Sequence, residues 1–331
     1  MSNLGVLLLK KSAVILVLSS VLAVSATSLF AAEDVYPSKL VRLVVPTSAG
    51  GTQDLVARQI APKLSERLGK QVIVDNRGGA GQIIGTEIVA KADPDGYTLL
   101  LPAGVHSIQA SLLKLPYDPI KSFTPIGLMS TVAFVLVVHP SVPAKSVKEL
   151  IALAKRKPGQ LIFAATGVGV TPHMAMELFK MLAGIDVTIV HFKGQGPTIP
   201  DLLGGHSNAS INSIPGFLPH IKSGKLRALG TTATKRTVAL PEVPTIAEAG
   251  LPGYETTSWY GILAPAGTPA PIVDRLNKEL TAILALDEIK KFFVTAGLDM
   301  NHLGPTDFAK FIEETIKGWE RVVKTANIKV E

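Results

Sequence analysis

The stretch Leu40-Val-Arg-Leu-Val-Val-Pro-Thr-Ser-Ala-Gly-Gly-Thr-Gln-Asp54, followed by a helical pattern to Leu68, indicates the fold class. Its β-branched start predicts a strand over Leu40–Val45, and its glycines predict a loop that leads into a helix. Further short apolar runs alternate with helical stretches along the chain. This alternation is typical of α/β proteins with mainly parallel sheets. The other strands are expected at Val72–Val74, Tyr97–Leu101, Phe134–Val138, Leu161–Ala164, Val187–Val190, Asn208–Ile211, Leu226–Gly230 and Tyr260–Leu263.

Residues 1–32 have the features of a secretory signal peptide. Lys10 and Lys11 precede the apolar run Ala13–Val24, which ends in the small residues Ser25-Ala-Thr-Ser28. The run is shorter than the ~20 residues that a membrane-spanning helix needs, although an uncleaved N-terminal anchor is the alternative. The chain has no cysteine, which excludes a lipid anchor on a lipobox cysteine, disulfides and thiol chemistry. We therefore expect a periplasmic protein that is not a lipoprotein.

The length and charge of the chain bound its number of domains and the kind of ligand it can bind. The 331 residues suit two domains of roughly 100–200 residues each. The formal charge is +7, but the basic residues are scattered among acidic ones and aromatic residues make up only 5%. Nucleic-acid binding is therefore not expected, whereas a mild positive field can favour anionic ligands.

Two chain crossings predict a division into lobes. The segment His139-Pro-Ser-Val-Pro-Ala144 follows one strand, and Trp259–Pro265 leads into a second proline-rich segment. If both crossings are hinges, residues 36–138 together with 264–331 form lobe 1, and residues 139–263 form lobe 2. Two such lobes leave a cleft between them.

Glycine-rich loops at the ends of strands are the candidate ligand contacts. The loop Thr47–Thr52 lies between a strand and a helix, where free backbone N–H groups can bind an anion. Thr166-Gly-Val-Gly-Val-Thr171 repeats this chemistry in the middle of the chain, and Lys193-Gly-Gln-Gly-Pro197 is a third candidate. The alternative is that each loop is a capped turn that binds nothing. The pairing of two loops, one per lobe, favours a shared anion site.

Enzyme motifs are weak. Gly79-Ala-Gly-Gln-Ile-Ile-Gly85 is similar to a variant dinucleotide-binding turn, so an exported nicotinamide-dependent enzyme is one alternative. A dinucleotide-binding turn needs an acidic residue at the end of a second strand about 20 residues later, and none stands there. The segment Gly205-His-Ser-Asn-Ala209 lacks the second glycine of a nucleophile elbow. The seven histidines form no metal-binding pair at helical spacing. We therefore expect no catalysis, no cofactor and no metal.

Many short motifs occur in an order that resembles one family. These are Pro46…Gly50-Gly-Thr-Gln-Asp54…Ala57-Arg58, Val74-Asp-Asn-Arg-Gly-Gly-Ala-Gly81, Pro94-Asp-Gly-Tyr-Thr-Leu-Leu100, Leu115-Pro-Tyr-Asp118, Pro172-His173, Lys193-Gly194, Asp201-Leu-Leu-Gly-Gly205, Gly224-Lys-Leu-Arg-Ala-Leu229, Pro244-Thr245, Glu248-Ala-Gly-Leu-Pro-Gly-Tyr254, Trp259-Tyr-Gly261 and Ala264-Pro-Ala-Gly-Thr268. From about Tyr36 to Ile328 the chain resembles the tripartite tricarboxylate receptor family, the Bug-type extracytoplasmic solute receptors.

The resemblance implies a two-lobed fold of the type II periplasmic-binding-protein kind, with the ligand in a cleft between the lobes. It implies a monomeric receptor that captures a small carboxylate (a di- or tricarboxylate, an amino acid or an aromatic acid) for a permease with one large and one small membrane subunit. A relative that has lost its ligand and serves signalling or as a scaffold is a further alternative. Asn212 stands where the family often has aspartate, which is consistent with an anionic ligand that carries no amine.

The expected ligand-binding residues share a position in or beside the loops described above. They are Thr47, Ser48, Ala49, Gly50, Gly51, Thr52, Asp54, His106, Phe134, Thr166, Gly167, Gly169, Thr171, His173, Gln195 and Asn212.

Overall fold

The structure is a computed structural model that describes residues 36–192, 195–325 and 328. The chain separates into two compact units, Met1–Ser38 and Lys39–Glu331. The predicted signal peptide lies outside the described residues. The unit Lys39–Glu331 contains all of the strands and helices given below.

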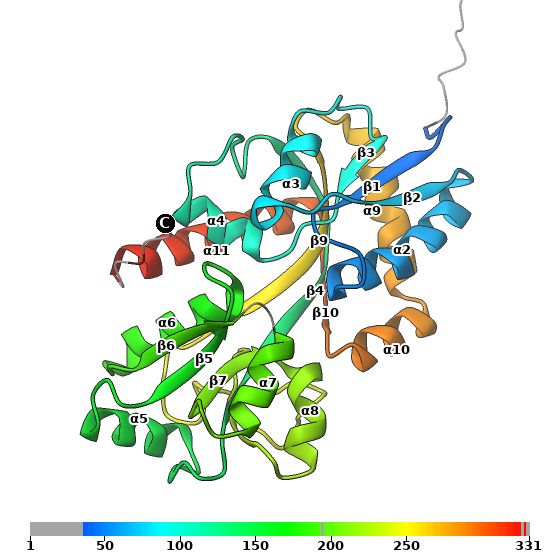
Figure 1. Ribbon diagram of the computed structural model, residues 1–331. Coiled ribbons are helices and arrows are strands. Elements are labelled where there is room, and N and C mark those ends of the chain that lie inside the picture. The colour runs from blue at the N-terminus through cyan, green and yellow to red at the C-terminus, as the bar shows by residue number, and fades with distance from the viewer. Residues whose placement is uncertain (1–35, 193–194, 326–327, 329–331) are drawn as a thin grey trace, which may run out of the picture. The chain divides into compact units, whose positions relative to one another are not determined.

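One ten-stranded sheet runs through this unit, with the order β2-β1-β3-β9-β4-β7-β5-β6, while β8 and β10 both pair with β4. In its first part, β1 (Val41–Val45) lies parallel between β2 (Val72–Asn76) and β3 (Thr98–Leu100). The strand β9 (Thr257–Pro265) runs antiparallel to β3 and to β4 (Phe123–Val138) (Figure 1). The strand β10 (Asp299–Leu303) pairs antiparallel with β4 near Ser130.

The C-terminal half of β4 belongs to the second part of the sheet. There β4 pairs antiparallel with β7 (Ala209–Ser213) and β8 (Arg227–Thr231). The strand β5 (Ile162–Thr166) lies parallel to β7 and to the edge strand β6 (Thr188–Phe192). Because β4 is shared, the two parts join without a break in the sheet.

Ten α-helices of the described residues complete the unit. The helices that contact the first part of the sheet are α2 (Thr52–Leu68), α3 (Ile83–Ala90), α9 (Ala270–Leu284), α10 (Asp287–Thr295) and α11 (Pro305–Thr325), and α4 (Val105–Leu112) packs on α11. The helices that contact the second part are α6 (Thr171–Ala183), α7 (Gln195–Leu203) and α8 (Ile214–Lys222). The helix α5 (Val147–Arg156) packs into the core cluster that contains Leu136 of β4 and Phe163 of β5. The α/β class predicted from the sequence is confirmed, but the sheet is mixed rather than mainly parallel, because β4 and β9 pair antiparallel with their neighbours. Within the described residues, none of the helices combines the length and the apolar character required to cross a bilayer.

The helix α11 connects the cores of both parts. Phe308 packs edge-on against the fully buried Trp259 of β9, with ring centroids 5.4 Å apart. Nearer the C-terminus, Trp319 and Val322 join a cluster with residues of α5 and α6. The helix α11 therefore contributes buried side chains to the cores of both parts. The proposed lobe boundaries at residues 138/139 and 263/264 remain a prediction.

Candidate functional site

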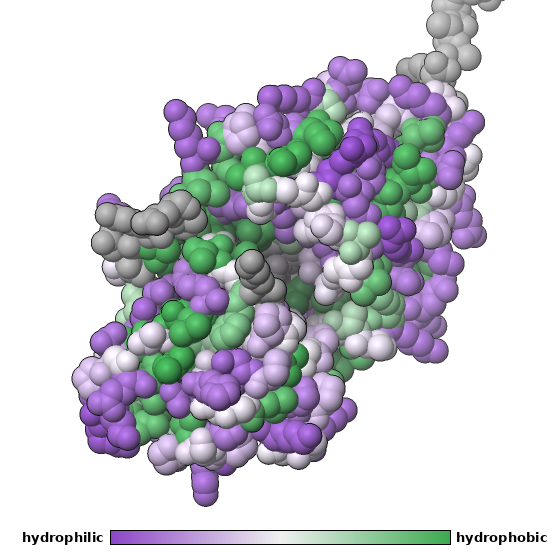
Figure 2. Space-filling view, in the orientation of Figure 1, coloured by the Kyte–Doolittle hydropathy of each residue, from purple (hydrophilic) through white to green (hydrophobic). Residues whose placement is uncertain are grey.

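A cavity of about 620 Å³ lies where several loops of both sheet parts meet. The surface is visibly hollowed in this region (Figure 2). Its lining residues are Pro46, Thr47, Ser48, Thr52, Gln53, Gly78, Gly79, Gly81, Gln82, Ala103, Val105, Val132, Phe134, Val170, Thr171, Pro172, Gln195, Ser213, Pro215, Gly216, Ser258, Tyr260, Ala296 and Leu298. A cavity of this size is typical of sites for small molecules.

Five helices of the described residues begin at the cavity wall: α4 at Val105, α7 at Gln195, and also α2, α6 and α8. Thr52 is the first residue of α2, Thr171 is the first residue of α6, and Pro215 lies in the first turn of α8. No side chain caps the N-terminus of α2, α6 or α8. Such ends carry unpaired N–H groups and the positive end of the helix dipole. Their convergence makes the cavity favourable for an anion.

The described residues of the cavity wall carry no formally charged side chain. None of these residues is Asp, Glu, Lys, Arg or His. Tyr260 supplies a phenolic hydroxyl, and burial raises the pKa of Tyr260 to about 12, so the group stays a neutral donor at ordinary pH. Among the described residues, there is no group of three or more His, Cys, Asp or Glu that could hold a metal ion. The described wall therefore offers neutral hydrogen-bonding groups and helix N-termini.

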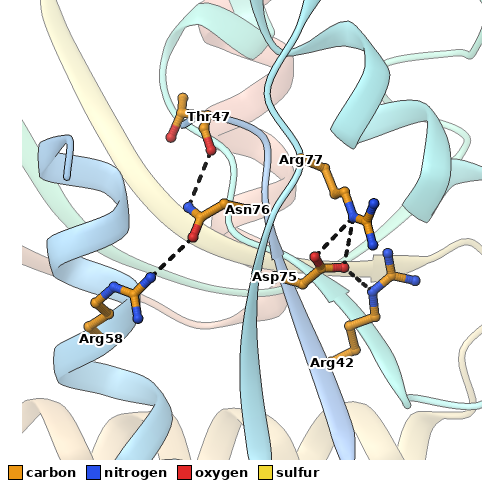
Figure 3. A network of polar contacts seen from close by, with 6 residues as sticks. All are labelled: Arg42, Thr47, Arg58, Asp75, Asn76 and Arg77. Carbon is orange, nitrogen blue, oxygen red and sulfur yellow. Dashed lines mark hydrogen bonds and ion pairs between the residues drawn. The ribbon is translucent and has the colours of Figure 1, made fainter. Parts of the chain in front are cut away.

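The loop between β1 and α2 is fixed by a network just outside the cavity (Figure 3). The buried Asp54 accepts hydrogen bonds from the Gly50 amide and from Nε of Arg58, both at 2.9 Å. Arg58 also donates to Oδ1 of Asn76 at 3.2 Å, and Nδ2 of Asn76 donates to the carbonyl of Thr47 at 3.2 Å. Burial alone would raise the pKa of Asp54, but the hydrogen bonds from Arg58, Gly50 and Asn76 outweigh it and hold that pKa below its usual range.

A second ionic group holds the end of β2. Asp75 pairs with Arg42 and with Arg77, the latter at 2.9 Å (Figure 3). Burial works to raise the pKa of Asp75, and the two arginines more than offset it, so the carboxyl stays ionised. Both networks place their charges on side chains that do not line the cavity.

The segment from Gly78 to Gln82 forms another part of the wall. Gly79, Ala80, Gly81 and Gln82 all have positive φ angles. Gly78 packs so closely that a Cβ atom there would lie 3.1 Å from the Ser48 amide nitrogen. In the sequence this glycine-rich turn is similar only to a variant dinucleotide-binding turn, whereas the structure brings it to the cavity wall.

The structure brings six of the expected ligand-binding residues to the cavity wall: Thr47, Ser48, Thr52, Phe134, Thr171 and Gln195. The other ten do not line it: Ala49, Gly50, Gly51, Asp54, His106, Thr166, Gly167, Gly169, His173 and Asn212. Several of these ten support the wall from behind. Asn212 accepts a hydrogen bond from the Ser213 amide at 2.9 Å and donates to the Thr166 hydroxyl at 3.4 Å.

The two histidines have internal partners. His106 is buried, and its Nε2 lies 2.8 Å from the carbonyl oxygen of Pro119. Burial lowers the pKa of His106, which stays neutral in its aromatic surroundings. Nδ1 of His173 accepts a hydrogen bond from the Gly169 amide at 3.1 Å, and its Nε2 lies 3.6 Å from Glu177. Both histidines therefore support loops near the cavity.

Sequence reasoning missed several residues of the wall. Gln53 and Gln82 contribute amides, Ser258 and Tyr260 contribute hydroxyls, and Ala296 and Leu298 come from the loop between α10 and β10. Of these residues, only Gln82 belongs to a motif that the sequence analysis considered as a binding site, the glycine-rich turn Gly79–Gly85. The others follow ordinary helix or strand patterns, from which a cavity cannot be read.

Comparisons with known proteins point to one family. The family model "Tripartite tricarboxylate transporter family receptor" matches residues 56–328. Protein BugT of Bordetella pertussis is 35% identical over 301 residues, which cover 90% of this chain and 92% of that protein.

Solved structures give the same result. A protein of R. palustris solved with adipate is 38% identical, with a TM-score of 0.77 over 89% of this chain and 99% of that one. MatC from Rhodopseudomonas palustris, with bound malate, is 33% identical, with a TM-score of 0.73 over 87% and 100% of the two chains. Members of this family are periplasmic receptors rather than enzymes. The chain belongs to the tripartite tricarboxylate transporter receptor family.

Proposed function

We propose that this chain is exported through residues 1–32 and captures a small carboxylate in the cavity for uptake by a transporter with one large and one small membrane subunit. Two similar structures hold adipate and malate, both dicarboxylates. The observation that carries the proposal is the neutral cavity on which the uncapped N-termini of α2, α6 and α8 converge. One helix N-terminus stabilises a nearby anion by about 0.3–1 kcal/mol, and by more where water is excluded. Three together would then favour a carboxylate by roughly 1–3 kcal/mol.

The ligand in this proposal carries no amine. An ammonium group would need an acidic partner, and the described residues of the wall supply none. Asn212 does not line the cavity, so the argument depends on these wall residues and not on the replacement at Asn212. Simple carboxylates should therefore bind more tightly than amino acids of the same length.

Binding is proposed to close two lobes, residues 36–138 with 264–331 and residues 139–263. The helix α2 packs on the first sheet part, while α6 and α8 pack on the second. A ligand that touches both groups of helices stabilises the closed form, because these contacts are absent from the open one. The loop Thr166–Thr171 would move with the second lobe.

A thermal-shift screen over a library of carboxylic acids tests the proposal, followed by calorimetry on each compound that raises the melting temperature. Succinate, succinamide and aspartate form one informative set, because they differ in charge and in the presence of an amine. Succinate is expected to bind more tightly than the other two. Tighter binding of aspartate would refute the proposed charge preference.

The location of the site is tested by blocking the cavity. Ser48 is exposed and lines the cavity, so Ser48→Trp adds bulk there without disturbing the core. Val238 is 69% exposed and lies outside the wall, which makes Val238→Trp the matched control. Loss of binding in Ser48→Trp alone is expected. Equal binding by both variants would place the ligand elsewhere, and no shift with any acid would favour a relative that has lost its ligand.

A further inference from the structure

Two glutamine side chains form a hydrogen-bonded relay that ends at the cavity. Nε2 of the buried Gln53 donates to the carbonyl oxygen of Leu101 at 2.6 Å. Nε2 of Gln82 then donates to Oε1 of Gln53 at 3.2 Å. Gln53 and Gln82 both line the cavity.

The start of the relay fixes the orientation of both amides. The oxygen and nitrogen of a glutamine amide can be exchanged without a change of shape, so their assignment depends on the partners. The carbonyl of Leu101 can only accept a hydrogen bond, and therefore Gln53 must turn its NH₂ group toward it. Oε1 of Gln53 then faces Gln82 and can only accept, so Gln82 must donate. Oε1 of Gln82 is left directed away from Gln53 as an acceptor.

The backbone holds Gln82 in this position. Gln82 has a φ of +89°, a conformation that side-chain-bearing residues rarely adopt. Its amide donates to the carbonyl of Gly79 at 3.0 Å, and its carbonyl accepts from the hydroxyl of Thr86 at 2.8 Å. The neighbouring Gly81 carbonyl accepts from the side chain of Gln109. Such strain persists only where the surroundings fix it, and it is concentrated at functional sites.

The third glutamine of the wall is already occupied at both ends. Nε2 of Gln195 donates to the Ser213 carbonyl at 3.0 Å, and its Oε1 accepts from the Ser213 hydroxyl at 2.6 Å. Of the three wall glutamines, Gln82 is therefore the one for which no partner of Oε1 is found among the described residues. A carboxylate ligand cannot satisfy this oxygen, because an ionised carboxylate has no hydrogen to donate.

We propose that Oε1 of Gln82 accepts a hydrogen bond from a hydroxyl group of the ligand, so that the receptor prefers hydroxylated carboxylates to their unsubstituted analogues. The inference rests on the proposed function and adds the class of carboxylate. A site with a fixed acceptor discriminates against an analogue that lacks the matching donor, because the acceptor then stays unpaired. One hydrogen bond of this kind corresponds to about a tenfold difference in affinity.

Calorimetry with matched pairs tests this inference. The pairs are succinate with each enantiomer of malate, glutarate with 2-hydroxyglutarate, and adipate with 3-hydroxyadipate. Gln82→Met removes the acceptor at nearly constant length, and Gln160→Met is the control because Gln160 is exposed and lies outside the wall. Melting temperatures without ligand verify that the variants fold.

The expected result is that, in at least one pair, the hydroxylated acid binds about tenfold more tightly to the natural chain. Gln82→Met should remove this preference, so that the ratio of the two affinities within the pair falls to about one, while Gln160→Met keeps the preference. If acids bind without any preference, or if Gln82→Met retains it, the role of Gln82 is wrong while the proposed function stands. If none of these acids, and no other carboxylate of the library, binds, both are overturned.

Discussion

Replacing Thr52 by aspartate should affect folding and binding in opposite directions. Thr52 is exposed, lines the cavity and is the first residue of α2, whose N-terminus has no side-chain cap. A carboxylate in the first turn of a helix stabilises it by about 0.3–1 kcal/mol. The same carboxylate would repel a ligand anion about 6 Å away by roughly 3 kcal/mol at an effective dielectric constant of 20. Solvent weakens this repulsion at an exposed position, so we expect Kd to rise at least about tenfold.

The assay compares Thr52→Asp with Thr52→Asn, which has nearly the same shape and no charge. Calorimetry at two salt concentrations should show a large rise in Kd for Thr52→Asp that becomes smaller in high salt, and only a modest rise for Thr52→Asn. The melting temperature without ligand should be equal to or higher than that of the natural chain. Equal values of Kd in the two variants, independent of salt, would show that no anion binds near the N-terminus of α2.

Three further outcomes can be checked. Burial raises the pKa of Tyr260 to about 12, above its unfolded value near 10, so the stability that it contributes below pH 10 is lost between pH 10 and 12, by at most roughly 2.7 kcal/mol. Burial also raises the pKa values of Tyr117 and Tyr254, so Tyr260→Phe should reduce this slope in denaturant unfolding and not abolish it. The pKa of Asp54 is held below its usual value of 3.8, so its contribution to stability is present above about pH 4 and is lost in acid. On acidification, the free energy of unfolding of Asp54→Asn should therefore fall less than that of the natural chain. Gly216 lies inside α8, and a Cβ atom there would be 2.5 Å from the Gln195 side-chain amide. Gly216→Ala should therefore displace the Gln195 side chain and weaken ligand binding, while the melting temperature stays constant or rises. Unchanged binding would contradict a role for Gln195.

The features that could be predicted from the sequence are those with a local signal. The run of β-branched residues before Pro46 and the glycines after it mark a strand, a loop and a helix start, and three residues of that loop line the cavity. Ser146 caps α5 by accepting the Glu149 amide at 3.2 Å, as its spacing predicts. Local hydrogen bonding determines both features, so no knowledge of the rest of the chain is required.

The remaining features depend on contacts between distant segments. Ser258 and Tyr260 lie on a strand whose residues are nearly all buried, so their pattern is that of a core strand. Leu298 follows α10 and is brought to the cavity by the pairing of β10 with β4. The positive φ of Gln82 has no sequence signal, because a glutamine is unusual in that conformation. Asn212 is the opposite case: the sequence suggested a ligand contact, whereas its side chain forms hydrogen bonds inside the protein with Thr166 and Ser213.

The distribution of charge has a consequence for release. Arg42, Arg58 and Arg77 are paired with Asp54 or Asp75, so among the described residues the groups that favour an anion in the cavity are helix ends and neutral donors. Each of these contributions is weak, and they are divided between the two parts of the sheet. In the proposed closure, separation of the parts would remove the contributions of α6 and α8 together and leave those of α2. A ligand held by one ion pair would keep most of its binding energy when the receptor opens. A ligand held by many weak donors on both parts of the sheet would lose most of that energy. Transfer to a transporter then requires only that the receptor opens.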